Sequence, residues 1–166
     1  GSIPMGHELA VTPLQMIAAH AVLANGGRKI SPHLLMMTDS REPEARQVVV
    51  SRVVREEVAD WVVREPMAAV VQRGTGKQAR LEGITVFGKT GTAQKTDPEN
   101  GGYVSDRHIS SFVCGAPAEN PRLLVLVMVD EPQGQQYGGS VAAPTAARIL
   151  KRGLDLEHFL SLAGSH

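Results

Sequence analysis

Hydrophobic residues recur every three or four positions in two stretches of the first half of the chain, and each stretch predicts a helix. In the first stretch these residues are Leu14, Ile17, Ala18 and Ala21. Thr12-Pro13-Leu14-Gln15 adds a capping box, with a hydroxyl at the N-cap, proline at the first helical position and glutamine three residues after the cap. The helix is therefore expected to run from about Pro13 to Asn25, and residues 30–37 and 47–50 are expected to be extended.

The second amphipathic helix is predicted to begin near Ser51. The apolar residues on one of its faces are Val54, Val58, Trp61 and Val62. Trp61 is expected to be the largest side chain that this helix buries. Pro66 cannot donate a backbone hydrogen bond and its ring clashes with the carbonyl four residues earlier. A kink is expected there, or a break followed by a second helix over residues 67–73.

Three segments of the second half have the pattern of strands. Residues 84–94 begin as a strand, residues 109–114 alternate weakly, and residues 123–129 form a continuous valine-rich run. A continuous run of this kind is typical of a central strand that is buried on both faces. The last two segments are expected to form a hairpin, and residues 95–107 are expected to be a polar loop.

The order of the elements predicts the fold class. A last helix should begin near Pro144, after a glycine-rich loop over residues 134–140. This order indicates an α+β fold, because two helices are followed by three strands and a last helix. The three strands are expected to form an antiparallel sheet flanked by the helices. Residues 1–166 are expected to form a single domain, because a chain of this length suits one sizeable core. Gly1-Ser2 is typical of a cloning scar, and the chain is expected to be a fragment.

Composition excludes several classes of function. Lysine and arginine number 17, as do aspartate and glutamate, so there is no overall positive field to hold nucleic acid. One cysteine and six histidines without metal-ligand spacing indicate neither a metal site nor a cofactor. No run approaches the roughly 18–20 apolar residues of a membrane span, and no signal peptide is recognisable. The chain as given is expected to be soluble.

The candidate functional site is the segment Ile84–Gln94, in which small and hydroxyl residues surround one lysine. In a strand, Thr90 and Thr92 share one face and Lys89 points to the other, while Gly91 allows a close approach. Two hydroxyls, an ammonium group and free backbone N–H groups suit a carboxylate or an oxyanion. An exposed edge strand that lysine protects from aggregation has the same pattern, and the spacing leaves both interpretations open.

The same segment also matches a phosphate-binding loop letter for letter. Residues 83–90 read G-x-x-x-x-G-K-T. A phosphate-binding loop needs a buried strand before its first glycine and a helix that begins at the lysine. Residues 78–82 are polar, and Gly91 follows where the helix should propagate. The nucleotide-binding interpretation is therefore rejected.

Lys89-Thr90-Gly91-Thr92 resembles the Lys-Thr-Gly box of the serine penicillin-recognising enzymes. Other stretches, in the same order, resemble the C-terminal part of the transpeptidase domain of class B penicillin-binding proteins. The resemblance runs from about Gly6 to Leu150, and its further stretches are Val11–Gln15, Ala24–Gly27, Gly74–Gly76, Ser111–Val113, Pro117–Arg122, Tyr137–Gly139 and Ala142–Pro144. It implies a penicillin-binding/β-lactamase-like transpeptidase fold.

The resemblance implies a role for each residue of the box. Lys89 would set the electrostatics of the site and help to hold the substrate carboxylate. The hydroxyls of Thr90 and Thr92 would bind that carboxylate, and the backbone N–H of Thr92 would be one half of the oxyanion hole. Gly91 would let the acyl donor lie along the strand, and Gln94 would have a supporting role.

The family's other catalytic boxes do not occur in the chain. The nucleophile comes from a Ser-x-x-Lys box and the proton relay from a Ser-x-Asn box, but no serine here has lysine three residues later or asparagine two residues later. The chain alone is therefore expected to be catalytically inert, although it carries the carboxylate-binding wall of an acyltransferase. Its full-length parent is expected to be a serine-type D,D-transpeptidase.

The partners and the location follow from the resemblance as expectations. The parent would bind the D-alanyl-D-alanine stem peptide and β-lactams and cross-link peptidoglycan in division or elongation. It would be membrane-anchored at the outer face of the bacterial cytoplasmic membrane, in a cell-wall synthesis complex. Three strands alone would leave sheet edges exposed, so self-association is expected. A β-lactamase or penicillin-sensor domain and a noncovalent scaffolding fragment remain the alternatives.

Overall fold

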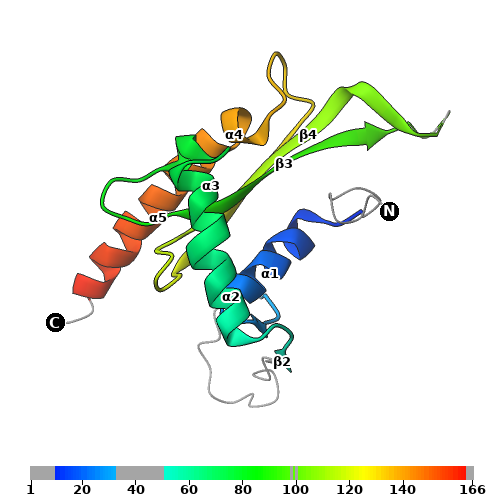
Figure 1. Cartoon of the computed structure of the whole chain (residues 1–166). Helices are drawn as coiled ribbons and strands as arrows, with labels where there is room; N and C mark the ends of the chain where they lie inside the picture. The colour runs from blue at the N-terminus through cyan, green and yellow to red at the C-terminus, as the bar shows by residue number, and fades with distance from the viewer. Residues whose placement is uncertain (1–9, 33–50, 98, 100, 164–166) are drawn as a thin grey trace, which may run out of the picture.

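A three-stranded antiparallel sheet forms the middle of the fold, with helix α5 (Ala143–Ala163) on one face and helix α1 (Pro13–Ala24) on the other (Figure 1). This computed structural model describes residues 10–32, 51–97, 99 and 101–163. The extended segments predicted over 30–37 and 47–50 lie almost wholly outside the described residues. The predicted α+β class and the three sheet strands are confirmed.

Helix α1 begins where the capping box predicts. The Gln15 N–H donates to Thr12 Oγ1 at 3.2 Å, and the Thr12 N–H donates to Gln15 Oε1 at 2.8 Å. The prediction that the second helix begins near Ser51 is wrong. Residues Ser51–Arg52 form strand β2, which pairs antiparallel with β1 (Arg28–Lys29), and helix α2 (Glu56–Val62) begins after it.

Pro66 lies in a short π-helical segment, η3 (Val63–Met67), between α2 and the helix α3 (Ala68–Gln72). The three segments run as one rod (Figure 1). The Ala68 N–H reaches the Val63 carbonyl five residues back, so a widened turn accommodates a residue that has no N–H. The predicted interruption at Pro66 therefore occurs as a π turn, and a second α-helix follows it.

Trp61 is not a core residue, which corrects the sequence-based prediction. Its side chain is 59% exposed. The rod instead buries Ala59, Val63 and Met67, which recur every fourth position and so share one face. Trp61 is two positions from Ala59 and projects from the other side.

The sheet strands are β3 (Phe87–Thr96), β4 (Tyr103–Ala116) and β5 (Leu123–Asp130), in the order β3-β4-β5. The predicted hairpin of the last two strands is confirmed. Two other predictions are wrong. Most of the predicted loop 95–107 is strand, because the polar ends of β3 and β4 pair as far as Thr96 opposite Tyr103. The middle strand is β4; the valine-rich β5 lies at an edge of the described sheet and is only half-buried.

Two apolar clusters lie on opposite sides of the sheet. The larger joins Phe112 and Cys114 of β4 to Leu150 of α5 and Val71 of α3. The smaller joins η3 to Phe87 and to partly buried residues of α1. The start of β3 is thus fixed from both sides, while the sheet beyond it is open on the α1 side. In the described part of the chain, no helix combines the length and apolar character that a bilayer crossing requires.

Candidate functional site

Strand β3 directs its candidate residues to two different faces of the sheet. Thr90 pairs with Phe112, whose side chain lies in the cluster with α5, and paired residues project from the same face. Lys89 pairs with Val113 and therefore projects from the face that α1 partly covers. The alternation predicted from the sequence holds in the structure.

The Lys89 side chain is exposed and bends along its own strand. Its Nζ donates to the Thr90 carbonyl at 2.6 Å. No carboxylate of the described residues lies within ion-pair distance of Lys89. The ammonium group thus faces solvent beside the backbone of the strand, where an incoming anion can reach it.

The two threonine hydroxyls each have a partner on the α5 side of the sheet. Thr90 Oγ1 lies 2.9 Å from Thr75 Oγ1, in the turn that follows α3. The Gly138 N–H donates to Thr92 Oγ1 at 3.3 Å, from the start of the short helix α4 (Gly138–Val141). A hydroxyl with one such partner keeps hydrogen-bonding capacity for another.

Glycines let α4 contact the backbone of β3 and β4. A Cβ on Gly138 would lie 2.1 Å from the Ser111 carbonyl oxygen and 2.6 Å from the Gly91 carbonyl oxygen. This close approach of α4 to the Gly91 carbonyl depends on the absence of a side chain at Gly138. A Cβ on Gly91 itself would meet the Ser111 side chain, with Oγ at 2.4 Å.

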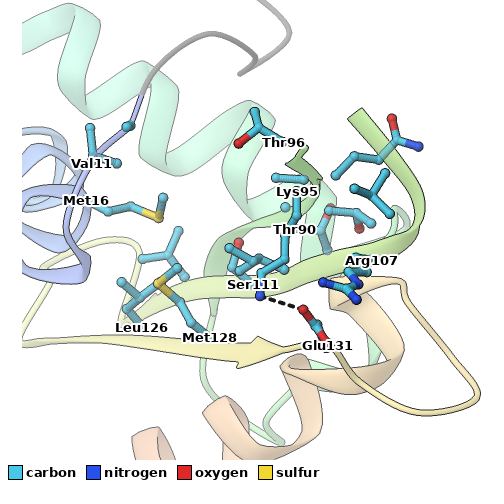
Figure 2. Close-up of a pocket in the computed structure, with 18 of the residues that line it drawn as sticks. Val11, Met16, Thr90, Lys95, Thr96, Arg107, Ser111, Leu126, Met128 and Glu131 are labelled. Atoms are coloured by element: carbon cyan, nitrogen blue, oxygen red, sulfur yellow. Dashed lines mark hydrogen bonds and ion pairs between the residues drawn. The ribbon is translucent and has the colours of Figure 1, made fainter. Parts of the chain in front are cut away.

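An open groove of about 1340 Å³ runs along the α1 side of the sheet. All five residues predicted for the site, Lys89, Thr90, Gly91, Thr92 and Gln94, line it. Its floor is apolar: Figure 2 shows Met16 of α1 on the same side of the sheet as Leu126 and Met128 of β5. One wall of the groove is thus polar strand backbone, and the floor is hydrophobic.

An ion-pair cluster lies near the far end of the groove. Lys95 Nζ lies 2.8 Å from Asp130 Oδ1 and 2.7 Å from Glu131 Oε1 (Figure 2 shows the pair with Glu131). The hydrogen bonds that Lys95 donates, first to Asp130 and then to Glu131, raise the pKa of Lys95 above its ordinary value. The sequence did not predict this cluster, because Lys95 was expected to lie in a polar loop. No local signal links residues 35 positions apart.

Among the described residues, no three or more His, Cys, Asp or Glu side chains are grouped so that they could hold a metal ion. The candidate chemistry is that of a lysine, hydroxyls and backbone groups around an anion.

A family model places the chain among known proteins. Residues 1–151 match the penicillin-binding protein transpeptidase domain, and the chain belongs to this family. It is 38% identical over 155 residues to stage V sporulation protein D of Bacillus subtilis, covering 90% of this chain and 24% of that protein. It is 34% identical over 163 residues to a probable peptidoglycan D,D-transpeptidase FtsI of Caulobacter vibrioides, covering 91% and 27%. The chain thus spans about a quarter of the length of these relatives.

A solved structure agrees with the family. Penicillin-binding protein 3 of Mycobacterium tuberculosis, in complex with ampicillin, matches with a TM-score of 0.82 and 32% identity. The match covers 94% of this chain and 37% of that one. The resemblance to class B penicillin-binding proteins is therefore confirmed for the family and the fold.

Proposed function

We propose that this chain supplies the substrate-carboxylate and oxyanion wall of a peptidoglycan D,D-transpeptidase. The observation that carries the proposal is the arrangement of Lys89–Thr92 on an edge strand beside a groove, in a member of the transpeptidase family. The ligand would be the terminal carboxylate of a D-alanyl-D-alanine stem peptide, or that of a β-lactam. The complex of the Mycobacterium tuberculosis relative with ampicillin supports the second ligand class.

In this proposal, Lys89 attracts the carboxylate and the hydroxyls of Thr90 and Thr92 donate to it. A carboxylate is acceptor-only, so an ammonium group and two hydroxyls form a matched donor set. Gln94 has a supporting role beside these three donor groups. The exposed Lys89 ammonium, 2.6 Å from the Thr90 carbonyl, already lies beside the strand where the carboxylate would arrive.

The Thr92 N–H is the proposed oxyanion donor. In an antiparallel strand, residues two apart direct their backbone groups to the same edge. The Thr90 carbonyl is reached by the Lys89 side chain, which supports an accessible edge for Thr90 and hence for Thr92. When a serine attacks the acyl carbonyl, the negative charge that develops on oxygen would be stabilised by this N–H. The attacking serine and its proton relay are proposed to come from other parts of the longer protein.

A binding titration tests the proposal. N-acetyl-D-alanyl-D-alanine added to the 15N-labelled chain should shift the amide signals of residues 89–94, and the L,L diastereomer should shift them less. Lys89→Gln should weaken binding, whereas Lys77→Gln, an exposed lysine of the 3-10 turn η4 (Lys77–Ala79), should not. Absence of binding by the unmodified chain, or equal effects of the two substitutions, would overturn the proposal.

Covalent labelling tests the assignment of the nucleophile. The chain incubated with benzylpenicillin should keep its intact mass, because acylation requires a nucleophile that it does not supply. A mass increase equal to one penicillin molecule would contradict this assignment. Rapid penicillin hydrolysis by the full-length parent would instead favour a β-lactamase.

Cell-wall synthesis is the proposed setting of the longer protein. It would be membrane-anchored, act at the outer face of the cytoplasmic membrane and work within a cell-wall synthesis complex. The transpeptidase family and the name of the Caulobacter vibrioides relative support the link to peptidoglycan synthesis. We also propose that the chain self-associates, because β5 lies at an edge of the described sheet and its side chains are only partly buried. Sedimentation showing a clean monomer at high concentration would contradict self-association.

A further inference from the structure

The turn Gly74–Gly76 contacts Thr90, the second residue of the Lys-Thr-Gly box. Thr75 Oγ1 is 2.9 Å from Thr90 Oγ1, although the two residues are 15 positions apart and belong to different elements. Both hydroxyls are accessible enough to exchange partners with water, so the pair persists only if the turn and the strand are held at this distance. The surrounding contacts meet that requirement.

The turn is fixed on its own helix and on the core of the sheet. The Gly74 N–H donates to the Ala69 carbonyl and the Gly76 N–H to the Val70 carbonyl, each at 2.9 Å. A Cβ on Gly76 would lie 2.8 Å from the ring of Phe112, which is fully buried. The turn thus packs against a fully buried side chain, so a shift of Thr75 would disturb the packing of the core.

Helix α4 fixes the other side of the threonine pair. A Cβ on Gly139 would lie 2.1 Å from the Thr75 carbonyl oxygen and 3.4 Å from Thr90 Cγ2. The methyl group of Thr90 therefore faces the glycine, and its hydroxyl faces Thr75. The two branches of Thr90 have different neighbours, which selects one staggered rotamer.

We propose that Thr75 is a positioning residue for ligand binding by Thr90, an inference that rests on the proposed function. A carboxylate only accepts hydrogen bonds, so Thr90 must donate its hydroxyl hydrogen to the ligand. Thr75 must then donate to the Thr90 oxygen. Thr75 thereby holds the rotamer of Thr90 and turns its hydrogen away from the turn, toward the ligand. A chain of two hydroxyls in this direction also polarises the terminal donor.

Thr75→Val removes the donor and keeps the shape of the side chain. In the free 13C,15N-labelled chain, the three-bond couplings to Thr90 Cγ2 should report one rotamer for the unmodified protein and for Thr75→Ser. Rotamer averaging should appear in Thr75→Val. Thr145→Val, at an exposed threonine of α5, is the matched control and should leave the couplings unchanged. Unchanged Thr90 couplings in Thr75→Val would overturn the proposal.

Binding of N-acetyl-D-alanyl-D-alanine gives the second measurement. Thr75→Val should bind roughly fivefold more weakly, the effect of losing one ordinary neutral hydrogen bond, and Thr75→Ser should restore binding. Equal affinity of Thr75→Val and the unmodified chain would overturn the positioning role. Failure of the unmodified chain to bind would overturn the proposed function instead, and the couplings would still decide whether Thr75 sets the rotamer of Thr90. Equal melting temperatures of the variants would show that the fold is intact.

Discussion

Lys95 Nζ lies 2.8 Å from Asp130 Oδ1, an ion pair that joins β3 to the end of β5 across the middle strand of the sheet. The same ammonium group contacts Glu131, a non-glycine residue with φ of +47°. One cation thus compensates two neighbouring carboxylates and anchors a strained turn. The Lys95 side chain is 28% exposed, whereas those of Asp130 and Glu131 are 66% and 42% exposed. The cluster should therefore matter more than an ordinary surface pair chiefly because one cation serves two carboxylates.

We predict that Lys95→Met lowers the melting temperature at pH 7, because Asp130 and Glu131 are left without their shared cation. Since the pKa of Lys95 is raised, its contribution to stability should be complete below the ordinary value of 10.5 and be lost as pH rises through the folded-state pKa. The difference in melting temperature between the unmodified chain and Lys95→Met should therefore shrink at high pH.

Lys151→Met is the matched control for this prediction. Lys151 pairs with Asp155 on α5 with both side chains more than half exposed, so its loss should change stability little. If the two variants melt at the same temperature at pH 7, the cluster around Lys95 stabilises the fold no more than an exposed ion pair does.

Gly138→Ala is predicted to destabilise the fold by about 1–3 kcal/mol, the usual cost of overpacking. The added Cβ would lie 2.1 Å from the Ser111 carbonyl oxygen, so α4 must move away from the strand and from Thr92. Urea unfolding measures the change. Gly153→Ala is the control: its Cβ would meet only the end of the Leu123 side chain, and alanine favours a helix over glycine by up to about 1 kcal/mol. A stable Gly138→Ala variant would mean that α4 contacts the strand less closely.

Cys114 is predicted to resist alkylation in the folded chain. Burial raises the pKa of its thiol to about 12, and the thiolate is the reactive form. Iodoacetamide at pH 8 should label the single cysteine only as fast as the chain unfolds, and urea should accelerate labelling. The sign of the shift adds a pH dependence. Stability from the protonated thiol is complete below its ordinary pKa of 9.0 and declines as pH rises toward 12. Labelling at the rate of a free thiol would show that Cys114 is accessible.

Local chemistry explains which features of the fold and site could be predicted. The capping box at Thr12 and the alternation of Lys89 and Thr90 involve neighbours in sequence, and both occur in the structure. The cluster of Lys95 with Asp130 and the contact of Thr75 with Thr90 depend on how separate elements meet. The polar ends of β3 and β4 show no strand periodicity in the sequence. They are strand because they pair with each other.

The last prediction concerns Trp61, which lies on the exposed side of its helix, whereas Ala59 and Val63 lie on the buried side. With 59% of its surface exposed, the single tryptophan should emit at long wavelength in the folded chain, and acrylamide should quench it nearly as well as in urea. Trp61→Gln should change the free energy of unfolding by no more than about 0.5 kcal/mol, as at most surface positions. Met67→Ala, on the buried face of the same rod, should cost about 2–5 kcal/mol. A blue-shifted, protected emission would mean that a partner surface, such as a second copy of the chain, covers Trp61 in solution.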